Sequence, residues 1–341
     1  MICRIALDAM GGDLGPSVNI EGAIQAARET GHEIILVGDQ SVLERELKKH
    51  DIGSLPITIH HAPTVIGMDE KPVEGCRAKQ DSTIMIGAQM VSDKKADALV
   101  SAGNSGATMT AALWHMRRIP GVSRPAIATT MPTLTSYCLL LDAGANVECK
   151  PKHLYQFALM GNIYAETVMN VDKPRVGILT IGEEEGKGNE LTVAASELMR
   201  TGEFNFIGNV EGRDIPKGTV DVVVCDGFVG NIVLKFAEGL AEALLTLIKR
   251  SIKKHPLAVI GGLLMKGAFR DIKKKVDYAE YGGAPLLGVN GVAIISHGGS
   301  NAKAIKNAIR LAGDFVTKGT NRKIHEKLNQ HRLAEPNSKG T

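Results

Sequence analysis

Short apolar segments recur along the chain, and each ends in a polar turn that leads into an amphipathic stretch. Seven segments are rich in Val, Ile, Leu and Ala and then turn through Gly, Asp, Asn or Ser, at residues 2–13, 33–39, 97–107, 137–148, 175–190, 220–231 and 291–301. Near-continuous apolar strands are typical of parallel sheets covered by helices on both faces. We therefore predict an α/β fold with a doubly wound, mainly parallel sheet, Rossmann-like and in three α/β/α layers.

A long amphipathic stretch follows the sixth segment. From Ile232 onward, apolar residues recur at every fourth position, at Phe236, Leu240, Leu244, Ile248 and Ile252, which predicts a helix whose first half packs into the core. Between residues 249 and 275 the chain then carries nine Lys or Arg residues against the single acid Asp271. A solvated helix face usually mixes both signs, so this excess indicates a surface with a special environment.

Pro256 and the pair Gly261–Gly262 should break this helix, so that a second helix returns antiparallel to the first. We predict a single catalytic domain over residues 1–320, a helical hairpin protruding from it over 245–283, and a polar tail over 321–341. The hairpin tip would contact a membrane surface through six apolar residues, namely Leu257, Val259, Ile260, Leu263, Leu264 and Phe269. Each nearby cation adds about 1 kcal/mol toward anionic lipid. A dimer contact through the same helices is the alternative.

Composition narrows the function classes. The 341 residues are 44% hydrophobic, which is enough for a large core, and no apolar run reaches the length of a membrane span. A net charge of +3 and an aromatic content of 4% argue against nucleic acid as a partner. Five scattered cysteines fit neither a disulfide framework nor a zinc site, and the N-terminus lacks a signal-peptide pattern, so we expect a cytoplasmic protein.

Familiar cofactor and nucleophile motifs are incomplete. The segment GGDLG at 11–15 is not G-x-G-x-x-G, and GEEEGKG at 182–188 has a P-loop's lysine but the wrong glycine spacing. His60 and His61 are adjacent on a predicted strand, PITIHH, so they point to opposite faces and cannot share a metal ion. There is no G-x-S-x-G nucleophile motif. We predict no cofactor, no metal and no covalent serine intermediate.

The glycine-rich turns predict an anion site instead. If all strands are parallel, their carboxyl ends share one edge, where backbone N–H groups and helix N-termini favour an anion. Each turn alone could simply be a tight turn with a helix cap. Polar side chains suited to hold phosphate and stabilise an acyl oxyanion follow these strands, at Asn104, Ser105, Asn146, Asn231, Ser300 and Asn301.

Charged residues in the same turns could have either a catalytic or a structural role. Lys187 lies between glycines and could neutralise phosphate, the oxyanion or a leaving thiolate, or it could be an exposed loop lysine. Carboxylates repel phosphate unless they face the backbone, so we expect Asp142 and Asp226 to cap turns. Phosphate is already an anionic nucleophile, and its direct attack on a thioester needs mainly alignment and oxyanion donors.

Six motifs together resemble one family: IALDAMGGDLGP, LVSAGNSGATMTAA, LLLDAGANVECKP, IGEEEGKGNE, VVCDGFVGNIVLK and ISHGGSN. This combination is similar to the fatty acyl-phosphate synthases of bacterial phospholipid synthesis, the acyl-acyl carrier protein:phosphate acyltransferases. The resemblance covers the chain to about residue 316. It implies transfer of a long acyl chain from acyl carrier protein to inorganic phosphate, giving the acyl phosphate used in phosphatidic acid synthesis. It also implies a fold similar to phosphotransacetylases and to isocitrate and isopropylmalate dehydrogenases.

The same resemblance implies a homodimer that associates peripherally with the inner face of the cell membrane, beside the membrane glycerol-3-phosphate acyltransferase. It assigns a cleft to Asp8, Gly11, Gly12, Asp13, Asn104, Ser105, Gly106, Asp142, Asn146, Lys187, Asn231, His297 and Asn301. Within it we take Lys187, Asn231 and His297 as catalytic, with His297 a proton donor, an orienting group or a structural cap. Arg117, Arg118 and Arg124 are candidates to receive the acidic carrier protein.

Two other functions use the same pattern. A nicotinamide-dependent hydroxyacid dehydrogenase would share the fold, and a noncatalytic scaffold could bind carrier protein and membrane. Phosphate-dependent thiol release separates both from an acyltransferase.

Overall fold

The computed structural model describes residues 1–276 and 278–334 of the chain. Each of the seven predicted segments contains a strand, and these strands are β1 (Arg4–Asp8), β2 (Glu33–Gly38), β4 (Ala98–Ser101), β6 (Tyr137–Leu141), β7 (Val176–Leu179), β9 (Val222–Val224) and β11 (Ala293–Ile295). The segment PITIHH forms β3 (Ile57–His61). The three strands that the pattern did not predict are β5 (Ala126–Pro132), β8 (Phe206–Val210) and β10 (Ala284–Leu287).

Helices connect most of these strands. They are α1 (Pro16–Thr30), α2 (Gln40–Leu47), α3 (Pro72–Ala78), α4 (Thr83–Ser92), α5 (Ser105–His115), α6 (Pro151–Thr167), α7 (Glu190–Arg200), α8 (Asp214–Lys217), α9 (Gly227–Lys254), α10 (Pro256–Leu264), α11 (Lys266–Val276), the 3-10 helix η1 (Tyr278–Glu280), α12 (Ala302–Thr317) and α13 (Thr320–Ala334).

The strands form one sheet of eleven in the order β3-β2-β1-β4-β11-β10-β5-β6-β9-β7-β8. Most pairs are parallel, as predicted, but β10 pairs antiparallel with both β11 and β5, and β5 pairs antiparallel with β6. The parallel groups on the two sides of this centre therefore run in opposite directions. The expectation that all strands end at one edge is wrong, because it assumed a wholly parallel sheet.

Helices cover both faces of the sheet, and strand residues alternate between them. One face carries a continuous core in which Ile5, Leu7, Leu139 and Val222 pack with residues of α1, α6, α7, α12 and α13. The other face has two separate clusters, one under α3, α4 and α5, and one under α8 and α9. On this face, a gap between the two groups of helices lies over the central antiparallel strands, flanked by α5 and α9.

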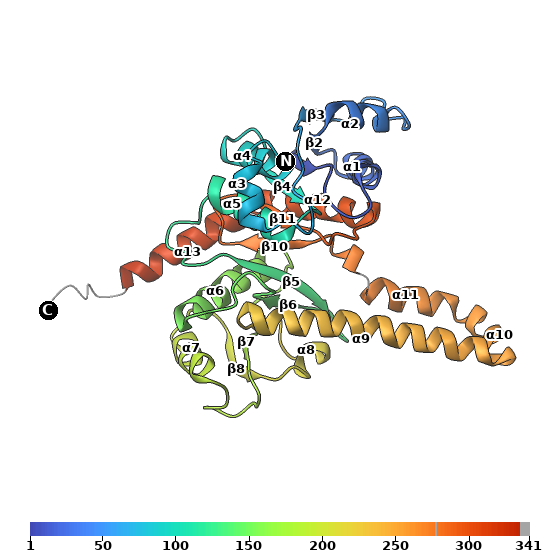
Figure 1. Cartoon of the computed structure of the whole chain (residues 1–341). Helices are drawn as coiled ribbons and strands as arrows, with labels where there is room; N and C mark the ends of the chain where they lie inside the picture. The colour runs from blue at the N-terminus through green and yellow to red at the C-terminus, as the bar shows by residue number, and fades with distance from the viewer. Residues whose placement is uncertain (277, 335–341) are drawn as a thin grey trace.

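The second half of α9 leaves the body together with α10 and α11 as a projecting hairpin (Figure 1). The break after α9 is at His255, whose backbone is extended, and Pro256 then starts α10. Gly261 and Gly262 do not break the helix as expected, because α10 continues through them to Leu264. Gly262 instead allows α10 to approach α9, since a Cβ atom there would lie 3.2 Å from Ile252.

The apolar residues of the hairpin are largely uncovered in the single chain. Leu257 and Leu264 are 84% exposed, Val259, Ile260 and Leu263 are also exposed, and Phe269 is half-buried. The first half of α9 was expected to pack into the core, yet Phe236 is 69% exposed, and Leu240 and Leu244 are exposed as well. That prediction is wrong for these residues, because the core contact is made by a neighbouring stripe of Val233, Leu234 and Ala237. Among the described helices, none is both long and apolar enough to cross a membrane.

Helix α13 occupies most of the predicted polar tail. Its Ile324 and Leu328 are buried in the main core, so the body of the protein extends past the boundary predicted at residue 320. Residues 335–341 of that predicted tail lie outside the described part of the chain.

Candidate active site

A cleft of about 380 Å³ lies in the gap between α5 and α9. Its polar lining comes from the ends of both parallel groups: Ser105, His297 and Ser300 from one, and Gly144 and Asn231 from the other. Its apolar lining includes Ile127 and Met131 of β5, Leu234, Ala237 and Ala241 of α9, and Ile295 of β11. The pairing register brings the ends of the two groups close together, because Ile295 at the end of β11 pairs with Ala284 of β10 and Leu141 at the end of β6 pairs with Ala128 of β5.

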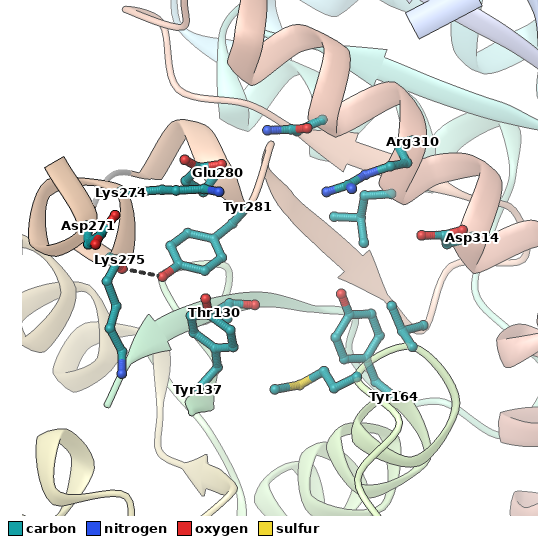
Figure 2. A pocket seen from close by; sticks show the side chains of 14 residues that line it. Thr130, Tyr137, Tyr164, Asp271, Lys274, Lys275, Glu280, Tyr281, Arg310 and Asp314 are labelled. Carbon is teal, nitrogen blue, oxygen red and sulfur yellow. Dashed lines mark hydrogen bonds between the residues drawn. The ribbon is translucent and has the colours of Figure 1, made fainter. Parts of the chain in front are cut away.

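A second cavity of about 630 Å³ lies where α11 rejoins the body (Figure 2). It shares Thr130 and Tyr281 with the cleft, and the Tyr281 hydroxyl donates to the carbonyl of Lys275 at 2.6 Å. Its charged residues balance, with three acids and three bases, namely Asp271, Glu280, Asp314, Lys274, Lys275 and Arg310. This balance gives no preference for an anion, so the cleft is the better candidate site.

The turns after β1, β4 and β11 pack against one another beside the cleft. The backbone N–H of Asp13 donates to the carbonyl of Gly298 at 2.8 Å, and an added Cβ atom on Gly12 would lie 3.0 Å from that same carbonyl oxygen. A methyl group on Gly11 would collide with the Asp8 carboxylate and crowd the backbone nitrogen of Gly103. The structure thus brings together the predicted residues of these three turns, and glycine is required for their close approach.

Asp8 lies beneath this group and is completely buried. Its carboxylate accepts hydrogen bonds from the Ser101 hydroxyl at 2.7 Å and from the backbone N–H of Gly11 at 3.0 Å. Burial raises the pKa of Asp8 above its ordinary value, although these hydrogen bonds act in the opposite direction. Asp8 therefore holds the turns in place and is shielded from the cleft.

Two helices begin at the cleft. Asn104 caps α5, because its side-chain oxygen accepts from the backbone N–H of Ala107. Its side-chain amide nitrogen donates to three carbonyls in the loop before α3, those of Gly67, Met68 and Glu70. Asn301 caps α12 in the same way through Ala304. Both side chains are engaged as caps, so the cleft-lining groups at these helix starts are Ser105 and Ser300.

Ser300 carries the clearest signal for a ligand. Its side chain is 4% exposed, it lines the cleft, and its hydroxyl has no hydrogen-bond partner within the part of the chain that the structure describes. A buried hydroxyl without a partner costs about 1–3 kcal/mol, so an acceptor or donor in the cleft would satisfy it.

His297 is exposed on the cleft wall next to Ser300. The backbone N–H of Gly299 donates to its Nδ1 at 3.1 Å. Nδ1 is thus an acceptor, which leaves the proton of the neutral ring on Nε2. In this tautomer Nε2 can donate a hydrogen bond to a group in the cleft.

The turn after β6 is organised by Asp142, as expected. Its Oδ1 accepts from the backbone N–H groups of Ile127, Gly144 and Ala145 at 3.0–3.2 Å, and its Oδ2 accepts from the backbone and side-chain nitrogens of Asn146 at 2.7 and 2.8 Å. Burial raises the pKa of Asp142, while these hydrogen bonds favour its charged form. The prediction that Asp142 caps a turn is confirmed.

Helix α9 begins against this turn. Asp226 caps it by accepting from the backbone N–H of Val229 at 2.9 Å, which confirms the second capping prediction. Asn146 is buried, and its side chain also donates to the carbonyl of Pro125 at 2.7 Å, so it serves the turn. Asn231 is exposed to the cleft, and a Cβ atom on Gly144 would lie 3.6 Å from its Cβ atom.

Lys187 lies elsewhere. It is exposed in the loop between β7 and α7, where its carbonyl accepts from the Asn209 side chain at 3.2 Å, and it is not among the residues that line the cleft. Its catalytic role stays a prediction. Gly106 begins α5 beside Ser105, where an added Cβ atom would lie 2.5 Å from Pro72, so its smallness is required for packing.

The sequence reasoning missed six polar residues that line the cleft, namely Thr129, Thr130, Lys235, Glu238, Tyr281 and Ser296. Lys235 is four residues after Asn231, so helical spacing alone could have placed both on one face of α9. Its ammonium pairs with Glu238 at 2.9 Å. Tyr281 precedes an unpredicted strand and carried no comparable signal.

Comparisons with known proteins find relatives that match nearly the whole chain. A family model described as fatty acid synthesis protein matches residues 3–323. The phosphate acyltransferase of Trichlorobacter lovleyi is 54% identical over 328 residues, which cover 96% of this chain and 95% of that protein. The phosphate acyltransferase of Geobacter sulfurreducens is 53% identical over 325 residues, covering 95% and 94%.

Solved structures show the fold. A phosphotransacetylase from Streptococcus pyogenes aligns with a TM-score of 0.64 at 18% identity, covering 93% of this chain and 94% of that one. A 4-hydroxythreonine-4-phosphate dehydrogenase from Klebsiella pneumoniae aligns with a TM-score of 0.52 at 12% identity, covering 93% and 99%. The predicted α/β fold and its similarity to phosphotransacetylases are confirmed.

Proposed function

Since the chain belongs to the fatty acid synthesis protein family and is a phosphate acyltransferase, we propose that its acyl donor is a long-chain thioester of acyl carrier protein. The product is then a fatty acyl phosphate, which supplies acyl groups for phosphatidic acid synthesis. The relatives' activity argues against the hydroxyacid dehydrogenase and the noncatalytic scaffold as alternatives.

The observation that carries the proposal is a cleft that combines polar groups at helix starts with apolar side chains of β5 and α9. Phosphate binds at the starts of α5 and α12, where Ser105 lines the cleft together with Ser300, whose hydroxyl has no partner among the residues that the structure describes. Helix N-termini supply free backbone N–H groups and a favourable dipole for an anion. Asp8 and Asp142 do not oppose this binding, because both carboxylates are buried and face backbone or hydroxyl donors.

The acyl chain lies along the apolar wall. Ile127 and Met131 of β5 face Leu234, Ala237 and Ala241 of α9 across this part of the cleft. Burial of each methylene group contributes about 0.8 kcal/mol, so a long chain binds here in preference to acetyl. Small alanine side chains on α9 leave the width that a hydrocarbon chain needs.

The reaction is a direct displacement. A phosphate oxygen attacks the thioester carbonyl carbon, the C–O bond forms, the C–S bond breaks, and no acyl-enzyme intermediate is needed. The proton of hydrogen phosphate passes to the leaving thiolate, and His297 donates a hydrogen bond from Nε2 to the departing sulfur. The products are acyl phosphate and the carrier thiol. Asn231 donates from its side-chain amide to the developing oxyanion.

Thioesters and acyl phosphates are both activated acyl compounds, so their exchange needs no ATP. The assay is release of free thiol from acyl carrier protein in the presence of phosphate, with the product trapped by hydroxylamine as a hydroxamate. We expect thiol release to require phosphate and to match hydroxamate one to one. Oxidation or reduction of a nicotinamide cofactor without thiol release would contradict the proposal.

The exposed apolar surfaces support two further parts of the proposal. The stripe Phe236, Leu240 and Leu244 on α9 would be covered by a second copy of the chain in a homodimer. The tip of the hairpin, with its basic flanks, would attach peripherally to the inner face of the cell membrane. The acyl phosphate would then be released beside the membrane glycerol-3-phosphate acyltransferase that consumes it.

A further inference from the structure

A cationic surface surrounds the N-terminal end of β5. We call it the β5 basic surface, and it consists of the exposed residues Arg117, Arg118, Arg124, Lys150 and Lys152. None of the five forms an ion pair with the described residues, whereas Arg4, Arg175 and Arg200 each pair with a carboxylate at 2.8–3.0 Å. Glu148 is the one exposed acid in the neighbouring turn over residues 142–150.

Hydrogen bonds hold Arg118 and the loop that carries the three arginines in place. Arg118 donates to the carbonyls of Val122 and Ser123, and Gln156 of α6 binds the same loop through the backbone N–H of Ser123 and the carbonyl of Gly121, both at 2.8 Å. Loop 117–125 is therefore tied to the start of α6. Burial, together with the positive charges of Arg124 and Lys150, lowers the pKa of His153. Both cations therefore lie near the same histidine.

A hollow of about 400 Å³ lies within this surface. It is lined by Arg117, Arg118 and the segment 119–122, with Leu113 beneath. Arginine around a small apolar hollow is a composition typical of protein–protein interfaces.

The β5 basic surface adjoins the cleft through one turn. Arg124 precedes Pro125, whose carbonyl accepts from Asn146, and the carbonyl of Asn146 accepts from Gly227 at the start of α9. Ile127 and Gly144 of the same region line the cleft. The basic residues therefore lie on the outer side of a turn whose inner side forms the cleft wall.

The hairpin lies at the other end of β5. The carbonyl of Leu134, just after β5, accepts from Lys275 of α11 at 2.9 Å. A seven-residue strand spans about 20 Å, so β5 separates the basic surface from the base of the hairpin by that length (Figure 1). The cleft follows β5 between them.

We propose that the acyl carrier protein docks on the β5 basic surface, which rests on the proposed function. The carrier is acidic, and a one-signed surface steers an acidic partner to it. Its thioester arm then enters the cleft at the Gly144 end, and the acyl chain points along β5 toward the hairpin. Donor docking and product release are thereby placed at opposite ends of one cleft.

The test compares two double charge reversals, Arg124→Glu with Lys150→Glu, and Arg45→Glu with Lys48→Glu. The second pair lies on and next to α2, is exposed, and changes net charge equally. For the first variant we expect the KM for acyl carrier protein to rise about tenfold and its salt dependence to weaken. Turnover of a carrier-free thioester, acyl-N-acetylcysteamine, and the KM for phosphate should stay at wild-type values, which also shows correct folding.

Four results would contradict either the docking proposal or the proposed function. An unchanged KM for acyl carrier protein, or an equal rise in the α2 control, would overturn the docking proposal. Loss of binding to anionic vesicles by the first variant, with its carrier KM unchanged, would also overturn it and assign the surface to lipid. If the wild-type protein releases no thiol from the carrier at all, it is the proposed function that fails.

Discussion

Buried aspartates shape the site without entering it. Asp8 and Asp142 each end or follow a strand, and each accepts backbone N–H groups of the turn that comes next. A carboxylate used in this way stabilises a turn that has few other partners. The side chains that remain available to a ligand in the cleft are uncharged, above all Ser105, Asn231 and Ser300.

Ser300→Ala tests the phosphate site. Because a hydrogen bond to a charged group is worth about 1.5–3 kcal/mol, we expect the KM for phosphate to rise at least about tenfold. The melting temperature should not fall, since the hydroxyl has no partner among the described residues. Ser296→Ala is the matched control: its hydroxyl donates to the carbonyl of Gly282 at 2.8 Å, so this variant should lose stability instead. A wild-type phosphate KM in Ser300→Ala would remove Ser300 from the site.

Lys187→Ala tests the predicted catalytic residue that lies outside the cleft. If its ammonium neutralises phosphate or the oxyanion during turnover, removal should lower kcat by about hundredfold. Steady-state hydroxamate formation measures the effect, and Lys187→Arg should restore part of it. Wild-type kcat in both variants would assign Lys187 the role of an exposed loop residue.

At the scale of elements, α9 connects the site to the rest of the molecule. Its first turn contacts the Asp142 turn, its middle lines the cleft, and its end forms the hairpin. Gly230 allows the first contact, because a methyl group there would collide with the backbone carbonyl of Asp142. The position of Asn231 therefore depends on the residue before it.

Gly230→Ala should push the start of α9 away from the Asp142 turn. We expect a loss of about 1–3 kcal/mol in the free energy of unfolding, typical of overpacking, together with a lower kcat. Gly239→Ala on the same helix is the control, because among the described residues no atom outside its own stretch of α9 lies within 4 Å of an added Cβ atom. It should stabilise the protein by about 0.5–1 kcal/mol. Urea unfolding measures both, and equal stability of the two variants would contradict the contact.

Leu257→Glu combined with Ile260→Glu tests the hairpin tip. Both side chains are exposed and apolar, so the two charges should prevent insertion into the acyl boundary without disturbing the body. Sedimentation with anionic vesicles should recover wild-type protein in the pellet and the variant in the supernatant. Turnover on a short-chain thioester should be equal, and pelleting of the variant would exclude the tip as the anchor.

At the scale of the whole molecule, the sheet is two parallel groups of opposite direction joined by antiparallel strands. This reversal leaves one face with a continuous core and the other with a gap, and the gap is the cleft. The same face presents the apolar stripe of α9, which the single chain leaves exposed.

Phe236→Glu combined with Leu244→Glu tests whether a second copy covers this stripe. We expect the wild-type protein to have the mass of a dimer in size-exclusion chromatography with light scattering, and the variant to have that of a monomer. Leu198→Glu on α7 changes an exposed leucine outside the stripe and should leave the mass unchanged. A dimeric stripe variant would place the contact elsewhere.

The sequence by itself determined the local features. Apolar runs identified the buried strands, because both faces of those strands are covered, and the capping roles of Asp142 and Asp226 followed from the repulsion between carboxylates and phosphate. The strands β5, β8 and β10 were missed, because none of them gives a continuous apolar run. β8 and β10 have only five and four residues, and the longer β5, AIATTMP, contains two threonines and ends in proline.

Tertiary structure alone decided which turns share a site. The direction in which two strands pair depends on residues far apart in the sequence, so the local pattern could not show the reversal at β5, β6 and β10. Because of this reversal, the site is a cleft between α5 and α9 and not a row of turns along one edge of the sheet. Likewise, helical periodicity showed that α9 has an apolar stripe, but whether the chain covers it depends on which neighbours pack beside it. For Phe236 and Leu244 no described neighbour does so fully, and they remain exposed.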